Sequence, residues 1–159
     1  MKRLLAFLLG CTSVEAKSIV TEDFLDLVAI IESNYNYDAV GDKGKAIGAW
    51  QMHEASWRES CQYLDRQNYA CVFSWEEVSD NHKKFAKDPD ISRLISRTYL
   101  QILEKQMLKA KIKVTPIGLY MAYNMGFRGA YNKNFSHTYI WLDSKRRSIL
   151  ARANQILSR

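Results

Sequence analysis

The sequence predicts a single, mostly α-helical domain that carries one small β-hairpin. Its 159 residues fit one domain and are enough to bury a core. Apolar residues recur three or four positions apart in most segments, which is typical of helices packed on one face. In contrast, three of the seven glycines fall together, at positions 41, 44 and 48, which predicts a turning segment between helices.

The first helix is expected over residues 22–33. Thr21 can cap its start, and the acidic Glu22 and Asp23 suit the positive end of the helix dipole. Its apolar residues share one face, because they follow helical spacing: Phe24, Leu27, Val28 and Ile31. Glu32 therefore lies in the last turn, next to the buried face.

Residues 38–52 are expected to form a short irregular hairpin that turns at Asp42-Lys43-Gly44. The remaining chain reads as helical. Helices are expected over 53–65, from a Ser74 cap to about Ala86, from an Asp90 cap through Met107, from Thr115-Pro116 to near Gly126, and over 144–157.

The N-terminus has the layout of a secretory signal. Lys2 and Arg3 precede the apolar run at 4–9, and small residues follow, so we expect residues 1–16 to be a signal peptide and 17–159 the mature domain. Leu8-Leu9-Gly10-Cys11 also resembles a bacterial lipoprotein box, which would attach lipid to Cys11. A short apolar helix is the plainer alternative.

The formal charge of +6 favours polyanionic partners. The basic residues are spread along the chain without a discrete tract, so we expect no nucleic-acid partner. Cys61 and Cys71 form an even pair that suits export and one short disulfide, with two free thiols as the alternative. The scattered histidines predict no metal site, and nothing in the sequence calls for a cofactor.

Glu32 is the leading candidate for chemistry. A general acid that works near neutral pH must stay protonated longer than a free glutamate does. A position near the negative end of a helix and beside apolar groups disfavours the charged form of the carboxyl group. The alternative is an ordinary surface glutamate in a last helical turn.

Three sequence blocks give this glutamate a context. Ile31-Glu32-Ser33, Gly48-Ala49-Trp50-Gln51-Met52 and Ala122-Tyr123-Asn124 resemble, in the right order, the signature blocks of soluble lytic transglycosylases. The resemblance implies an α+β lysozyme-like fold with the hairpin beside an active-site cleft. It implies Glu32 as the catalytic acid, and a substrate-binding set of Ser33, Gln51, Met52, Tyr123 and Asn124.

A second, local resemblance concerns Asp42. The block from Asp42 to Met52, with Trp57 and Cys61 beyond it, is similar to invertebrate-type lysozymes, in which a second carboxylate lies at a matching distance. The chain lacks the dense cysteine framework of that family and has Ala49 where those lysozymes have proline. Asp42 is thus either a second catalytic carboxylate or an ordinary turn residue.

Together these features predict an enzyme that cleaves the β-1,4 bond between N-acetylmuramic acid and N-acetylglucosamine in peptidoglycan. It would act as a lytic transglycosylase or a lysozyme, secreted, periplasmic or bound to the cell envelope. One alternative is a non-catalytic glycan-binding or wall-assembly protein with the same fold. The sequence leaves the choice of mechanism and the oligomeric state open.

Overall fold

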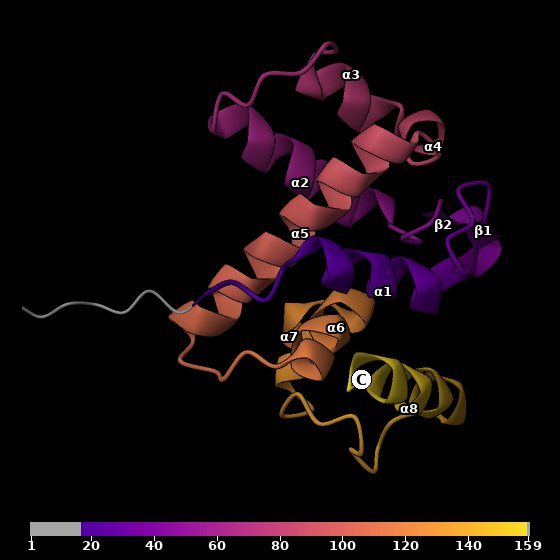
Figure 1. Ribbon diagram of the computed structural model, residues 1–159, viewed down its shortest axis with the longest axis vertical. Helices are drawn as coiled ribbons and strands as arrows, with labels where there is room; N and C mark the ends of the chain where they lie inside the picture. The colour runs from indigo at the N-terminus through magenta and orange to yellow at the C-terminus, as the bar shows by residue number, and fades with distance from the viewer. Residues whose placement is uncertain (1–16, 159) are drawn as a thin grey trace, which may run out of the picture.

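The computed structural model describes residues 17–158, and it confirms a mostly helical fold with a small two-stranded antiparallel sheet (Figure 1). The predicted signal and Cys11 lie outside the described residues. The elements are α1 (Glu22–Ser33), β1 (Val40–Gly41), the 3-10 turn η1 (Asp42–Gly44), β2 (Ala46–Ile47), α2 (Glu54–Arg66), α3 (Trp75–Asp80), α4 (His82–Phe85), α5 (Pro89–Lys109), α6 (Pro116–Met125), α7 (Phe127–Tyr131) and α8 (Ser144–Leu157).

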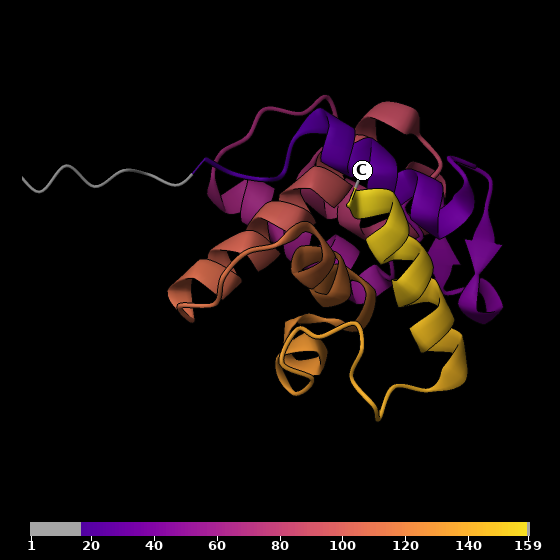
Figure 2. The same cartoon turned by 60° about the horizontal axis from the view of Figure 1, so that its bottom comes forward.

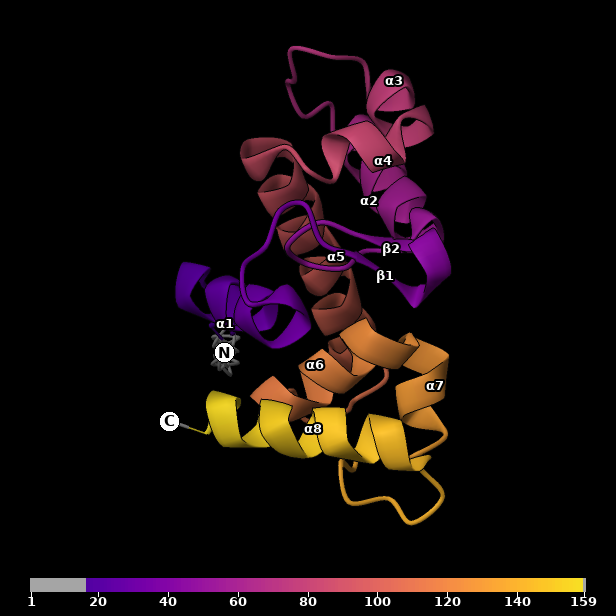
Figure 3. The same ribbon diagram turned by 90° about the vertical axis from the view of Figure 1, so that its right-hand side faces the viewer.

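The long helix α5 connects the two ends of the molecule. Helices α2, α3 and α4 lie at one end of α5, and α6, α7 and α8 lie at the other (Figures 1 and 3). Helix α1 packs against α5 and α8, and α8 also covers α6 (Figure 2). The hairpin lies beyond the C-terminal end of α1, with Val40 paired to Ile47. Among residues 17–158, no helix is long and apolar enough to cross a bilayer.

Side-chain caps set most helix starts. Thr21, Ser74 and Thr115 each accept a hydrogen bond from the backbone three residues ahead, as the sequence predicts. The predicted Asp90 cap is wrong, because Asp88 accepts from the backbone nitrogens of Asp90 and Ile91. The reason is Pro89, which suits the first helical position and forces the residue before it to be extended.

Two other boundaries differ from the prediction. The expected helix from Ser74 to Ala86 is split into α3 and α4, because Asn81 leaves helical geometry with φ −106° and ψ 41°. Helix α7 was not predicted. It follows α6 directly, since Gly126 takes φ +75° and turns the chain before the next helix begins.

The core contains two tryptophans that sequence patterning alone leaves ambiguous. Trp50 and Trp57 are both almost completely buried. Each indole still satisfies its N–H group: Trp50 Nε1 donates to the carbonyl of Leu25, and Trp57 Nε1 donates to that of Val78, both at 2.9 Å. These bonds attach the segment after the hairpin to α1 and attach α2 to α3.

The predicted disulfide between Cys61 and Cys71 is absent, since both residues are free thiols. Cys61 belongs to the core-facing side of α2, whereas Cys71 lies exposed in the loop before α3. Burial raises the pKa of the Cys61 thiol to about 12, so this thiol stays protonated at neutral pH and behaves as a small apolar side chain.

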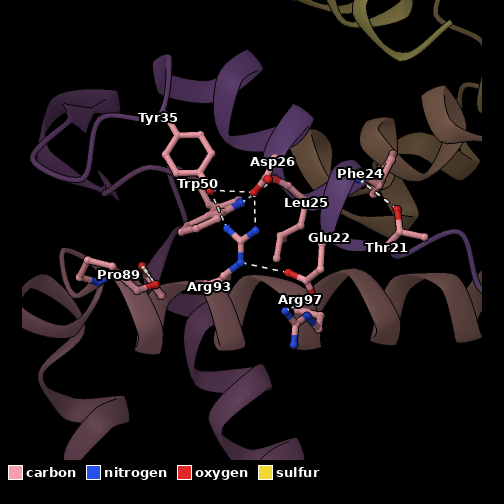
Figure 4. A network of polar contacts seen from close by, with 11 residues as sticks. Thr21, Glu22, Phe24, Leu25, Asp26, Tyr35, Trp50, Pro89, Arg93 and Arg97 are labelled. Carbon is pink, nitrogen blue, oxygen red and sulfur yellow. Dashed lines mark hydrogen bonds and ion pairs between the residues drawn. The ribbon is translucent and has the colours of Figure 1, made fainter. Parts of the chain in front are cut away.

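Arg93 on α5 holds α1 and the segment after the hairpin in place. Its guanidinium donates to Glu22 and Asp26 of α1 and, at 2.6 Å, to the hydroxyl of Tyr35 (Figure 4). The same group lies 5.8 Å from the ring centre of Trp50. Three elements that are distant in sequence therefore meet on one planar cation, which can donate in several directions at once.

We predict that Arg93→Ala lowers the free energy of unfolding by roughly 2–3 kcal/mol, because Asp26 loses its charged partner and the Tyr35 hydroxyl loses its donor. Arg97 is the matched control, since among residues 17–158 its ion pair is with Glu22, whose side chain is mostly exposed. Arg97→Ala should cost less than about 1 kcal/mol. Urea denaturation followed by circular dichroism measures both, and equal losses would contradict the central role of Arg93.

Candidate active site

A cleft of about 470 Å³ opens where α1, the hairpin, α6 and α8 meet. Glu32 contributes from the end of α1, and residues 41, 42 and 46 contribute from the hairpin. Gln51 and Met52 follow, with Tyr123 and Asn124 from α6 opposite. The start of α8 forms a further wall through Asp143, Lys145, Arg146 and Ile149. All three blocks singled out in the sequence therefore reach one cavity.

Glu32 is held from α6. The hydroxyl of Tyr120 donates to Glu32 Oε1 at 2.8 Å, and Asn124 Nδ2 approaches the same oxygen at 3.5 Å. Burial raises the pKa of Glu32 above its ordinary value, while these two donors and the charge of Arg152 oppose the shift in part. The carboxyl group thus keeps its proton to higher pH than a free glutamate, as a general acid requires.

The end of α1 sets the direction of the chain after Glu32. Asn34 caps the helix in the left-handed region at φ 56°, and Tyr35 follows at φ 65°. Ser33 then donates to the carbonyl of Ala49 at 2.7 Å and accepts from the backbone nitrogen of Asn36 at 2.9 Å. Ser33 is absent from the cleft lining, so its hydroxyl holds the hairpin against α1.

The block from Gly48 to Met52 is shaped by close backbone contacts. Gly48 takes φ +78°, and a Cβ there would lie 1.9 Å from the carbonyl oxygen of Ala86. Gln51 also has a positive φ, of 48°. Its side-chain amide donates to the carbonyl of Gly48 at 2.9 Å, so the residue both lines the cleft and closes its own turn.

The other expected substrate-binding residues line the cleft, but their polar atoms differ in how far they are already hydrogen-bonded within the protein. Met52 lines the cleft but is almost fully buried, and its sulfur accepts from Ser96 at 3.1 Å. Tyr123 lines the cleft as well, while its hydroxyl donates to the carbonyl of Trp50 at 2.7 Å. Asn124 lines the cleft too, and its buried Oδ1 has no hydrogen-bond partner among the described residues.

Asp42 has a very different environment from Glu32. It lies in the 3-10 turn of the hairpin, with φ 42°, and its side chain is 57% exposed. Its Oδ2 lies 3.5 Å from Nε2 of His53, which is itself about half exposed. Asp42 therefore lines the cleft with a largely solvated side chain, whereas Glu32 is more enclosed.

The sequence reasoning missed Tyr120, Arg152 and the wall from α8. Tyr120 is four residues before Asn124, so helical spacing places both side chains on the face of α6 that meets Glu32. The four-residue spacing between Tyr120 and Asn124 could therefore have indicated Tyr120 as a neighbour of Glu32. Arg152 donates to the carbonyl of Ile31 at 2.6 Å, and no sequence pattern links it to a residue 121 positions away.

Within residues 17–158, no cluster of three metal-binding side chains occurs.

The mostly helical fold with one small hairpin is that of the α+β lysozyme-like class. A comparison with protein-family models matches residues 12–145 to the transglycosylase SLT domain. The chain therefore belongs to this family, which comprises peptidoglycan-cleaving lytic transglycosylases. Comparisons with curated proteins and with solved structures give no match.

We predict that Glu32→Gln stabilises the protein relative to the parent as pH rises. Burial raises the pKa of Glu32 in the folded state above its value in the unfolded chain, which is near 4.3. Below the unfolded pKa the group is protonated in both states and costs no stability. As pH rises through the folded pKa, ionisation of the buried carboxyl group lowers the stability of the parent. The amide in the variant never ionises. Melting temperatures at pH 4 and pH 8 should show the difference growing with pH, and a constant difference would contradict the raised pKa.

Gly48 offers a test of the backbone. Gly48→Ala combines left-handed strain with a clash against the Ala86 carbonyl, and we expect a loss of about 3 kcal/mol or more. Gly44 is the control, because it has a similar φ of +88° but open space around its Cβ position. Gly44→Ala should cost about 1–2 kcal/mol. Equal losses in chemical denaturation would mean that the clash is relieved by movement.

Proposed function

We propose that this chain cleaves the β-1,4 bond between N-acetylmuramic acid and N-acetylglucosamine in peptidoglycan, with Glu32 as the general acid. The observation that carries the proposal is the enclosed Glu32 carboxyl group in a polar cleft, in a chain of the transglycosylase SLT family. A protein that only binds glycans does not need a buried carboxyl group with a raised pKa and two donors, Tyr120 and Asn124, beside it.

The first step needs a proton at the glycosidic oxygen. Glu32 donates it as the C1–O4 bond breaks, and the leaving sugar departs as an alcohol. The carboxylate that remains keeps the hydrogen bond from Tyr120, which strengthens as charge develops. Asn124 also faces this carboxylate, with its Nδ2 3.5 Å from Glu32 Oε1.

The second step distinguishes the two mechanisms. We propose that the acetamido group of the substrate assists at C1 and that the 6-hydroxyl of the same sugar then attacks C1. Glu32 accepts the hydroxyl proton, which regenerates the acid and leaves a 1,6-anhydro end without consuming water. The match to the transglycosylase SLT family supports this route over a second catalytic carboxylate, and the side chain of Asp42 is solvated at the rim of the cleft.

We further propose that the chain acts outside the cytoplasm, with residues 1–16 as its export signal and 17–159 as the catalytic domain. The family acts on peptidoglycan, which lies in the cell envelope. The cleft wall from α8 adds basic side chains to a chain with a formal charge of +6, and such charge attracts anionic wall polymers. N-terminal sequencing of the exported protein tests the signal, since a retained Met1 argues against it.

The enzymatic proposal is tested with purified peptidoglycan. We expect Glu32→Gln to lose at least about a thousandfold in the rate of wall lysis while keeping the fold, because the acid no longer supplies a proton. Lysis at the parental rate would remove Glu32 from the mechanism.

Mass spectrometry of the products tests the second step. Anhydro ends are one water lighter than reducing ends, and we expect anhydro ends. Asp42→Asn should retain activity within about threefold of the parent, because that side chain is solvated at the rim. A loss as large as that of Glu32→Gln, together with reducing ends, would instead support two catalytic carboxylates.

A further inference from the structure

The two oxygens of Glu32 are in different surroundings. Oε1 accepts from the Tyr120 hydroxyl at 2.8 Å and faces Asn124 Nδ2 at 3.5 Å. Oε2 has no hydrogen-bond partner among the described residues. It is also not among the unpaired polar atoms that are fully buried, so part of it is accessible from the cleft. An oxygen that already accepts an O–H group is a poor place for the acidic proton.

We propose that Tyr120 is a positioning residue that keeps Glu32 Oε1 as an acceptor and thereby leaves Oε2, the oxygen open to the cleft, to transfer the proton. This inference rests on the proposed function, because it concerns how the acid in that reaction is oriented. It goes beyond the sequence blocks, since Tyr120 lies outside all three of them.

Tyr120 is suited to this part because it can act only as a donor to Glu32. Burial raises its pKa, and the neighbouring Glu32 charge raises it further, so the phenol stays protonated. Its side chain is fully buried on α6, the helix that begins at Thr115 and Pro116. No other acceptor for its hydroxyl is recorded in residues 17–158, so its proton is directed at Oε1.

Tyr123 does not take this role, although it belongs to the sequence block. Its hydroxyl donates to the Trp50 carbonyl, so it orders the hairpin side of the cleft. The different contacts of the two tyrosines follow from helix geometry. Residues 120 and 124 share the face of α6 toward α1, while residue 123 is turned toward the hairpin. The two tyrosines are therefore distinguishable by experiment.

The hydrogen bond from Tyr120 matters more after proton transfer than before it. A bond to a carboxylate is roughly twice as strong as one to a neutral acceptor. Tyr120 thus stabilises the anion that forms as the glycosidic bond breaks, and that difference between states is what lowers a barrier. Among the described residues, the other charged or titratable groups around Glu32 are Arg152 and Tyr123. Those that line the same cleft are Asp42, His53, Tyr99, Asp143, Lys145 and Arg146.

The test compares Tyr120→Phe with the parent in the pH dependence of kcat/KM for peptidoglycan fragments. Without the donor, the anion of Glu32 is less stable, so the alkaline limb should move to higher pH by about one unit. The plateau rate should fall about tenfold or more. A profile and plateau equal to those of the parent would overturn the proposal, since a packing role alone leaves the limb in place.

Tyr35→Phe is the matched control. It removes another phenol hydroxyl that donates to a carboxylate, that of Asp26 at 2.7 Å, in a network away from the cleft. We expect it to lower stability and to leave the alkaline limb unmoved. A similar shift of the limb in Tyr35→Phe would assign the effect to general loosening and overturn the specific role of Tyr120.

A measurement on the parent protein remains decisive if Tyr120→Phe does not fold. The ¹³Cζ resonance of Tyr120 should titrate with the same midpoint as the ¹³Cδ resonance of Glu32, and Glu32→Gln should abolish that titration. A Tyr120 resonance that ignores the ionisation of Glu32 overturns the proposal. If the contact titrates as expected but the parent shows no cleavage, the proposed function fails and the contact stands.

Discussion

The site depends on how the segment from Gly48 to Met52 satisfies its backbone. Backbone donors reach the carbonyls of Gly48 and Met52, whereas those of Ala49 and Trp50 are satisfied by side chains from other elements. Ser33 from α1 donates to Ala49, and Tyr123 from α6 donates to Trp50, while the Trp50 indole returns a bond to α1. The three sequence blocks are therefore joined by hydrogen bonds to buried backbone, and the cleft lies where they meet.

The opposite side of the same segment is held by a single cation. Arg93 joins α5 to α1 through Glu22 and Asp26, and its guanidinium also approaches the Trp50 ring (Figure 4). Helix α1 is thereby fixed at its start by ion pairs and at its end by Ser33. A glutamate in the last turn of a helix fixed at both ends keeps a defined position relative to α6, which general acid catalysis requires.

Environment separates the two carboxylates that the sequence could not rank. Glu32 is enclosed by α6 and α8, and burial raises its pKa, while Asp42 lies on the rim with half of its surface exposed and pairs with His53. In the proposed mechanism the enclosed Glu32 acts first as acid and then as base. In that mechanism the substrate supplies the second group.

By itself, the sequence determined the helical class, the hairpin, most caps and the residues of the three blocks, because periodicity, turn chemistry and local motifs are written in neighbouring positions. Local rules failed at Asp88, Asn81 and α7, where one proline or one backbone angle decided the boundary. Only the tertiary structure decided that Tyr120 faces Glu32 across 88 residues, that Ser33 braces the hairpin and that Cys61 is buried away from solvent. Contacts between distant elements depend on how the helices pack, and that packing leaves no periodic trace in the sequence.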